Sequence, residues 1–126
     1  MKKIHINNDD HYATPPELYN ELNKRFDFTF DPCPYNENDH DFDGLIVDWG
    51  ERNYVNPPYS QKSKELFVKK AIKEANKGKL CVLLIPVSTS TKLFHDHIKP
   101  NAKSIEFLRG RVKFGKRDHN GNFYYT

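Results

Sequence analysis

The run Asn-Pro-Pro-Tyr at residues 56–59 combines an amide, two rigid prolines and an aromatic ring. It follows the apolar pair Tyr54–Val55 and precedes a segment with helical spacing, which places it at the exit of a strand. In an open α/β sheet, ligands bind at that carboxyl edge. An amide oxygen and a backbone carbonyl can both accept protons from one exocyclic amine, and a ring can stack on the base that carries it. The alternative is an ordinary turn followed by a tyrosine that only packs.

The elements that must position this run alternate between helices and strands. Helices are predicted from Thr14 to about residue 26, over 66–75 and over 91–98, with Thr14 as N-cap, Pro15 at the first helical position and Glu17 closing a capping box. Strands are predicted over 28–31, 52–55, 80–85 and 104–108, and a short strand or extended run over 45–47. The run at 80–85 is typical of a strand buried on both faces. A hairpin pairs 111–114 with 123–125 around Asn120-Gly121. This order predicts an α/β fold with a mainly parallel sheet, helices on both faces and an antiparallel C-terminal edge hairpin.

Length and composition fit one domain over residues 1–126, with residues 1–13 flexible or ordered only by docking. The net charge of +3 and the pI of about 8.8 are compatible with an anionic partner without requiring one. The sequence has neither a membrane-spanning apolar run nor a signal-peptide core. Cys33 and Cys81 lie far apart and are interpreted as reduced thiols of a cytoplasmic protein. The spacing of cysteines and histidines does not suggest a metal site.

A set of short motifs in a fixed order carries a family resemblance. The set comprises Thr14–Tyr19 (TPPELY), Phe30–Cys33 (FDPC), Asp48-Trp49, Asn56–Tyr59 (NPPY), Leu83–Pro86 (LLIP) and Phe107–Phe114 (FLRGRVKF). With its motifs in this order, the chain resembles phage-type DNA N6-adenine methyltransferases, which use S-adenosylmethionine. The resemblance implies a reduced Rossmann-like methyltransferase fold and transfer of a methyl group to the N6 amino group of adenine in double-stranded DNA.

The resemblance implies catalytic roles for the four residues Asn56, Pro57, Pro58 and Tyr59. Asn56 and the Pro57 carbonyl are expected to accept hydrogen bonds from the adenine amino group. Accepting both protons favours a pyramidal nitrogen and releases its lone pair for the methyl group. Tyr59 is expected to stack on the base after it has flipped out of the duplex.

Cofactor contacts are implied at matching positions. Asp31 and Pro32 stand at the end of the predicted first strand, near the methionine and ribose end; Asp31 could instead cap a turn. Asp48 is expected to bond the cofactor's adenine, and Trp49 either packs on that ring or belongs to the core. Thr14 and Pro15 lie at a helix N-terminus that suits a carboxylate, although a capping box explains them equally well. Further candidates are Asn38 for the cofactor and Arg109, Arg111 and Lys113 for DNA phosphates, the alternative for the last three being a solvated hairpin.

Two departures from the family pattern leave alternatives open. No glycine-rich cofactor loop follows Asp31, and a final apolar strand after the hairpin region is missing or replaced by residues 123–125. The chain could therefore dimerise, take a strand from a partner, or be a degenerate nucleic-acid-binding module. The NPPY run also serves enzymes that methylate RNA or protein glutamine. For the leading interpretation, the expected role is a phage or prophage enzyme that modifies DNA in the cytoplasm of a bacterial host and protects it from restriction.

Overall fold

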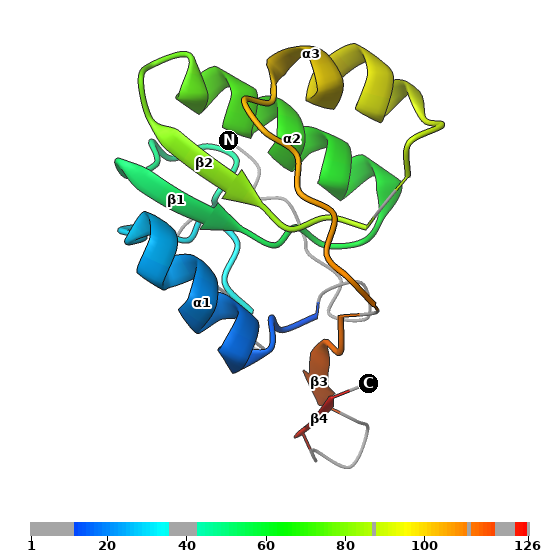
Figure 1. The fold of residues 1–126 in the computed structure, drawn as a ribbon. Coiled ribbons are helices and arrows are strands. Elements are labelled where there is room, and N and C mark those ends of the chain that lie inside the picture. Colours follow the sequence, from blue (N-terminus) through cyan, green and yellow to red (C-terminus); the bar gives the residue numbers. More distant parts are fainter. Residues whose placement is uncertain (1–11, 36–42, 87, 111, 118–122, 126) are drawn as a thin grey trace.

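A computed structural model describes residues 12–35, 43–86, 88–110, 112–117 and 123–125 (Figure 1). Along the chain these residues form α1 (Pro16–Phe26), β1 (Arg52–Val55), α2 (Gln61–Ala75), β2 (Leu80–Leu83), the π-helix η2 (Leu93–Ile98), α3 (Lys99–Asn101), β3 (Gly115–Arg117) and β4 (Phe123–Tyr125). β1 and β2 pair in parallel, with Arg52 opposite Leu80 and Val55 opposite Leu83. The fold is therefore mixed α/β.

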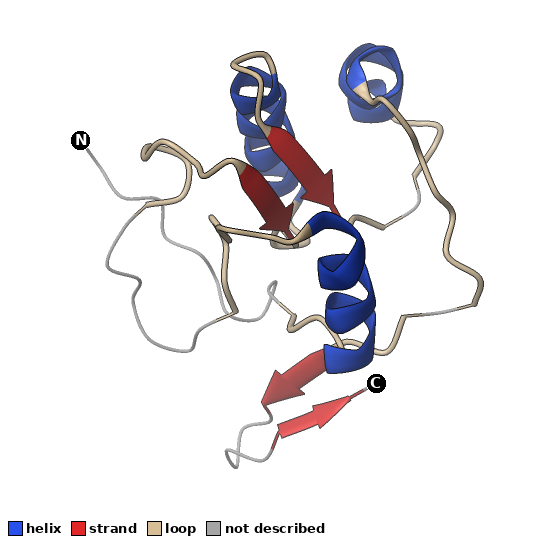
Figure 2. Ribbon diagram, turned by 60° about the vertical axis from the view of Figure 1, so that its left-hand side comes forward, coloured by secondary structure: helices blue, strands red, loops and turns tan. Residues whose placement is uncertain are grey.

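β1 separates two packing layers because successive side chains of a strand point to opposite faces. Val55 is fully buried and packs in one cluster with Phe67 and Ala71 of α2. Tyr54 points the other way, and its ring meets Tyr19 of α1 edge-on at 5.2 Å between centroids. α1 and α2 thus cover opposite faces of β1 (Figure 2).

α2 begins and ends at residues that suit helix termini. Ser60 is the N-cap, and its hydroxyl accepts a hydrogen bond from Ser63 N at 3.3 Å. The chain turns after Ala75 and reaches Gly78, whose φ of 93° lies in the left-handed region that glycine tolerates. The predicted helix over 66–75 is confirmed, and it starts earlier, at Gln61. The helix predicted over 91–98 is also present, as η2 with α3 following directly.

Two of the strands predicted in the first half of the chain are not formed. Residues 28–31 contribute only a single parallel bridge, from Phe30 to Asn53. Residues 45–47 form a turn in which Asp43 accepts from Leu45 N through its side chain and from Ile46 N through its carbonyl. These local hydrogen bonds to an aspartate offer the backbone an alternative to strand pairing, and residues 45–47 adopt the turn.

The prediction for 80–85 was wrong in extent and in burial, and the strand predicted over 104–108 is not formed. β2 stops at Leu83, its first residue Leu80 is 38% exposed and the rest are half-buried, because within the described residues β2 pairs only with β1. The 104–108 segment is extended but unpaired with any described strand, and Phe107 is 65% exposed. Without neighbouring strands, neither segment buries both of its faces.

The C-terminal hairpin pairs different residues from those predicted. β3 and β4 are antiparallel, with Gly115 opposite Tyr125, and form a two-stranded sheet separate from β1 and β2 (Figure 2). The predicted position at an edge of the parallel sheet is therefore not confirmed. Ala13 instead bridges to Gly115 in antiparallel fashion. No helix in the described part of the chain combines the length and apolar character needed to cross a membrane.

Candidate active site

Asn56 lies directly after β1, as predicted, and its side chain is held by the N-terminal residues. The residue is 5% exposed. Its Nδ2 donates to the carbonyl oxygen of Tyr12 at 2.7 Å and to Thr14 Oγ1 at 3.2 Å. Pro57 and Pro58 follow, both almost completely buried. The amide therefore has a defined orientation, with its nitrogen toward the 12–14 segment and its oxygen as the acceptor end.

Thr14 does not cap α1. The helix starts at Pro16, Pro15 occupies the N-cap position, and no side chain caps the helix. The Thr14 hydroxyl instead lies 2.6 Å from the hydroxyl of Tyr54 and accepts from Asn56. The predicted capping box was wrong because these two partners, some 40 residues away in sequence, engage the hydroxyl that the cap would have used.

A cleft of about 240 Å³ opens beside Asn56. Its lining residues come from the N-terminal segment, α1, the stretch after Phe30 and the end of β1: Ala13, Thr14, Tyr19, Asp31, Cys33, Tyr35, Tyr54 and Asn56. The structure thus brings together three of the predicted site residues, Thr14, Asp31 and Asn56. One carboxyl group and three tyrosines face this space, and none of the lining residues is a lysine, arginine or histidine.

Asp31 supplies the negative charge of the cleft at an energetic cost. Burial raises the pKa of its carboxyl group to about 6, although a hydrogen bond from Cys33 N to Oδ1 at 2.9 Å acts in the opposite direction. Burial, with a contribution from the Asp31 charge, also raises the pKa of the Cys33 thiol and of the Tyr54 hydroxyl. At neutral pH both of these groups are protonated, while Asp31 is mainly ionised and would gain from a bound cation.

Tyr59 packs among aromatic rings from both ends of the chain. Its ring centroid is 4.9 Å from that of Tyr12 and 5.6 Å from that of Phe114, the latter in an edge-on arrangement. Tyr12 and Phe114 are 6.3 Å apart. The ring expected to stack on a base therefore lies at a junction of the NPPY run with the N-terminal and C-terminal segments.

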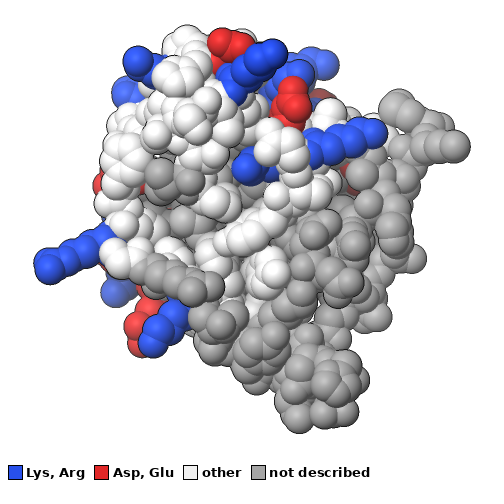
Figure 3. Space-filling model, turned by 90° about the vertical axis from the view of Figure 1, so that its right-hand side faces the viewer, with Lys and Arg blue, Asp and Glu red and all other residues white. Residues whose placement is uncertain are grey.

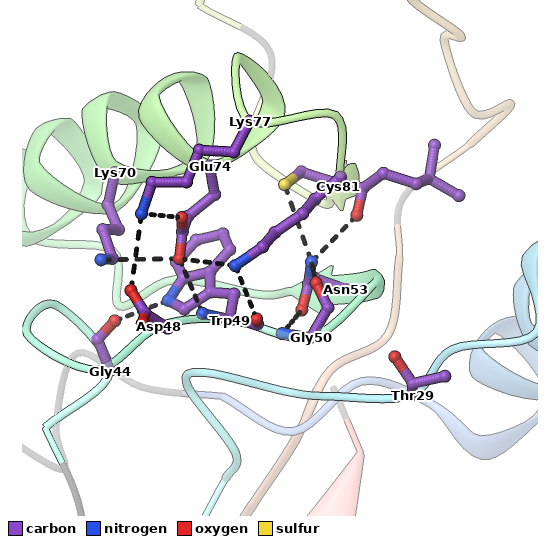
Figure 4. A network of polar contacts seen from close by, with 12 residues as sticks. Thr29, Gly44, Asp48, Trp49, Gly50, Asn53, Lys70, Glu74, Lys77 and Cys81 are labelled. Carbon is purple, nitrogen blue, oxygen red and sulfur yellow. Dashed lines mark hydrogen bonds and ion pairs between the residues drawn. The ribbon is translucent and has the colours of Figure 1, made fainter.

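Asp48 and Trp49 are not among the residues that line the cleft. Trp49 is 4% exposed and belongs to the hydrophobic core, and its Nε1 donates to the Gly44 carbonyl at 2.7 Å (Figure 4). Asp48 is exposed and forms an ion pair with Lys77 at 3.4 Å. Pro32 is also buried, and its carbonyl lies so close to Gly44 that a Cβ there would come within 1.8 Å. Of the two interpretations of Trp49, its position agrees with a core residue.

A buried carboxylate fixes the turn that enters β1. Glu74 on α2 is 0% exposed; its Oε1 accepts from Trp49 N at 2.6 Å and its Oε2 lies 3.0 Å from Lys77 Nζ (Figure 4). Lys79 and Lys70 approach Oε1 at 3.4 and 3.7 Å. Burial alone would raise the pKa of Glu74, but the Trp49 hydrogen bond and the three ammonium groups together lower it to about 2. Glu74 is thus ionised and anchors residues 48–50.

The predicted DNA contacts are described only in part. Arg109 and Lys113 are exposed, whereas Arg111 and the cofactor candidate Asn38 lie outside the described residues. On the face shown in Figure 3, Lys and Arg side chains gather along the upper part with acidic side chains among them, and further charged side chains of both signs lie at the lower left. In the part of the chain that the structure describes, no cluster of three or more His, Cys, Asp and Glu side chains is suited to hold a metal ion.

Sequence reasoning missed Tyr54, Tyr12 and Ala13, and it assigned Thr14 a different role. Tyr54 could have been found, because it stands two residues before Asn56 and strand alternation places both on one face. Tyr12 and Ala13 show no local sequence pattern that predicts a role, since their contact partners Asn56 and Gly115 lie far along the chain.

The comparison with known families agrees with the motif order. The family model described as DNA N-6-adenine-methyltransferase (Dam) matches residues 2–123, nearly the whole chain, and confirms the resemblance. Searches of curated proteins and of solved structures found no match.

Proposed function

Since the chain belongs to the DNA N-6-adenine-methyltransferase (Dam) family, whose members methylate N6 of adenine in DNA, we propose that Asn56 and the cleft beside it form its active site. One observation carries the proposal. The amide whose oxygen must accept the substrate's proton is held by two hydrogen bonds that its nitrogen donates, one to a carbonyl and one to a hydroxyl. Such preorganisation is what makes a hydrogen-bonding group effective in a transition state.

Asn56 and the Pro57 carbonyl act on the lone pair of the target nitrogen. In free adenine that lone pair is delocalised into the ring, so the amine is a poor nucleophile. We propose that the amide oxygen and the carbonyl accept both amino protons and hold the nitrogen pyramidal. Pro57 and Pro58 are buried and rigid, which fixes the position of the Pro57 carbonyl relative to the Asn56 amide. This alignment is worth on the order of 2–4 kcal/mol of barrier.

The methyl donor is S-adenosylmethionine in this proposal, as it generally is in methyltransferases; when bound it supplies a methyl group on a cationic sulfur. Asp31 is the single formal charge among the residues that line the cleft and suits a cationic ligand, and Thr14 lines the same cleft. Pro15 and Pro32, their neighbours in sequence, stay predictions as cofactor contacts. A volume of about 240 Å³ is below the roughly 300–1,000 Å³ of most small-molecule sites, so it suits the methionine end alone. Trp49 we assign to the core and Asp48 to the Lys77 ion pair; Asn38 stays a prediction.

Substrate DNA is proposed to contact Tyr59 and the exposed basic residues of the segment between α3 and β3. We propose that a flipped adenine stacks on Tyr59 and that Arg109 and Lys113 contact phosphates, with Arg111 retained as a prediction. Both described basic residues are exposed on the segment that leads from α3 to β3. The resulting role is DNA modification by a phage or prophage enzyme in the bacterial cytoplasm, protecting DNA from restriction. Survival of plasmids from an expressing strain upon restriction-enzyme digestion tests this role.

The architecture around the site is proposed to be a reduced Rossmann-like methyltransferase fold. The parallel pair β1–β2 between α1 and α2 is its centre. β2 pairs only with β1 among the described strands, so its outer edge is the place for a strand from a second copy or a partner. Sedimentation of the purified protein over a concentration series measures its oligomeric state, and a protein that is monomeric at every concentration would contradict self-association.

Methyl transfer from labelled S-adenosylmethionine to DNA tests the proposal directly. The expected product is N6-methyladenine, and Asn56→Ala should lower kcat by about 30- to 1,000-fold, the equivalent of 2–4 kcal/mol. Asn101→Ala is the matched control, because that exposed amide donates only to the His97 carbonyl. Methylcytosine as the sole product, or an Asn56→Ala protein as fast as the parent, would refute the proposal. Label in RNA or in protein would favour the other NPPY substrates, and absence of cofactor binding would favour a non-enzymatic module.

A further inference from the structure

The Asn56 amide is held by a chain of hydroxyl groups that starts inside β1. Tyr54 Oη lies 2.6 Å from Thr14 Oγ1, and Thr14 Oγ1 accepts from Asn56 Nδ2 at 3.2 Å. The Tyr12 carbonyl accepts the second amide proton at 2.7 Å. Tyr54, in β1, and Asn56, directly after it, are thus connected through Thr14, which lies about 40 positions earlier in the sequence.

The first member of this chain has a fixed position. Tyr54 is 2% exposed, and its ring packs against Tyr19 and Phe28, each at 5.2 Å between centroids. A hydroxyl on so confined a ring cannot follow Thr14 if Thr14 moves. It therefore defines where the Thr14 hydroxyl must lie.

The 12–14 segment is also held from its other side. Ala13 and Gly115 exchange two backbone hydrogen bonds, at 2.7 Å from Ala13 N and 2.8 Å from Gly115 N. The Tyr12 ring contacts Phe114 and Tyr59. Tyr12 and Thr14 consequently present their oxygens to Asn56 from a segment that is fixed at both faces.

These contacts select one of the two orientations of the amide. A carbonyl only accepts, so the Tyr12 oxygen requires the amide nitrogen on its side. A hydroxyl both donates and accepts, and Thr14 alone could therefore bond either end of the amide. If the Thr14 proton is donated to Tyr54, only lone pairs remain for Asn56, and these too require the nitrogen.

We propose that Tyr54 is a positioning residue for methyl transfer: by accepting the Thr14 hydroxyl proton, it makes Thr14 and the Tyr12 carbonyl hold Asn56 with its oxygen toward the target amine. This inference rests on the proposed role of Asn56 and gives Thr14 a function other than cofactor binding. Tyr54 and Thr14 act on the chemical step without touching the reacting atoms.

Steady-state kinetics separate positioning from ligand binding. Tyr54→Phe keeps the ring contacts and removes the hydroxyl; kcat should fall about tenfold, while KM and the Kd for S-adenosylmethionine stay within about twofold. Thr14→Val should behave alike, and Thr14→Ser should restore the parent rate. The double variant Tyr54→Phe/Thr14→Val should be no slower than Thr14→Val alone, because both act through one contact. Thr29→Val is the matched control: Thr29 bonds Arg52 twice at the start of β1, so it should lose stability and keep kcat.

A second readout does not depend on activity. In ¹⁵N spectra, the side-chain NH₂ protons of Asn56 should exchange with solvent at least about threefold faster in Tyr54→Phe than in the parent. Unchanged exchange together with the parent kcat would overturn the inference, as would a Thr14→Val defect confined to cofactor Kd. A parent protein that methylates no adenine would refute the proposed function instead, and the exchange measurement would still decide whether Tyr54 positions the amide.

Discussion

Replacing Glu74 by glutamine removes the buried charge on which four groups converge. The carboxylate accepts from Trp49 N and faces the ammonium groups of Lys70, Lys77 and Lys79. Removing one partner of a buried ion pair costs about 3–5 kcal/mol. Glutamine keeps an acceptor for Trp49, and Lys77 is 45% exposed and can return to water, whereas Lys70 is only 10% exposed. We therefore expect a loss of about 3 kcal/mol at neutral pH, the lower end of that range, and a Tm lower by roughly 10 °C.

The loss should depend on pH in a defined direction. The pKa of Glu74 is lowered from 4.5 to about 2 in the folded protein, so its contribution is complete above about pH 4.5 and disappears as the pH falls through about 2. The parent and Glu74→Gln should accordingly differ most near pH 7 and converge on acidification. Below the folded-state pKa, both carry a neutral side chain at this position.

Urea unfolding followed by fluorescence measures this difference, because Trp49 is the single tryptophan of the chain and contacts Glu74 directly. Glu65→Gln is the control on the same helix. Glu65 is 41% exposed and pairs with Lys69 at 3.0 Å, so its replacement should leave the unfolding midpoint nearly unchanged. Equal stability of the parent and Glu74→Gln at pH 7, or a difference that persists unchanged near pH 2, would refute the reasoning.

Three further results are expected. Asp31→Asn should raise the Tm in calorimetry at pH 7.5, because burial raises the Asp31 pKa from 3.8 to about 6 and the ionised carboxylate therefore destabilises the fold. The gain in Tm should vanish below about pH 4, and cofactor binding should weaken; an unchanged Tm at pH 7.5 would contradict this prediction. Phe107→Ser should change the free energy of unfolding by less than about 0.5 kcal/mol, because the ring is 65% exposed; a larger loss in urea titration would reveal a contact beyond those described. Iodoacetamide should label Cys33 only on unfolding and Cys81 slowly, because burial raises the pKa of both thiols, that of Cys81 to about 11. Rapid labelling of Cys33 in the native protein, detected by mass spectrometry, would contradict this prediction.

Local patterns predicted those parts of the molecule whose determinants are close in sequence. The strand that delivers Asn56 and the helix after it follow from apolar spacing and from the turn at Gly78. The 104–108 segment has the composition of a strand, but composition supplies no pairing partner, and none of the described strands pairs with it.

The site itself depended on contacts that no local pattern reports. Thr14 satisfies every rule for a helix cap, yet its hydroxyl bonds Tyr54 and Asn56 instead. Trp49 could have faced a cofactor, and its place in the core is linked to Glu74, which lies 25 residues later and buries its charge beside the Trp49 backbone. Both outcomes were decided by tertiary partners, which override local preference wherever a buried polar group must be satisfied.

The bridge between Ala13 and Gly115 has a consequence for biosynthesis. A growing polypeptide on the ribosome has Tyr12, Thr14 and the NPPY run long before it has the residue that secures the 12–14 segment. The amide of Asn56 can be locked in place only after Gly115 has emerged, so synthesis of the chain through Gly115 must precede the first turnover.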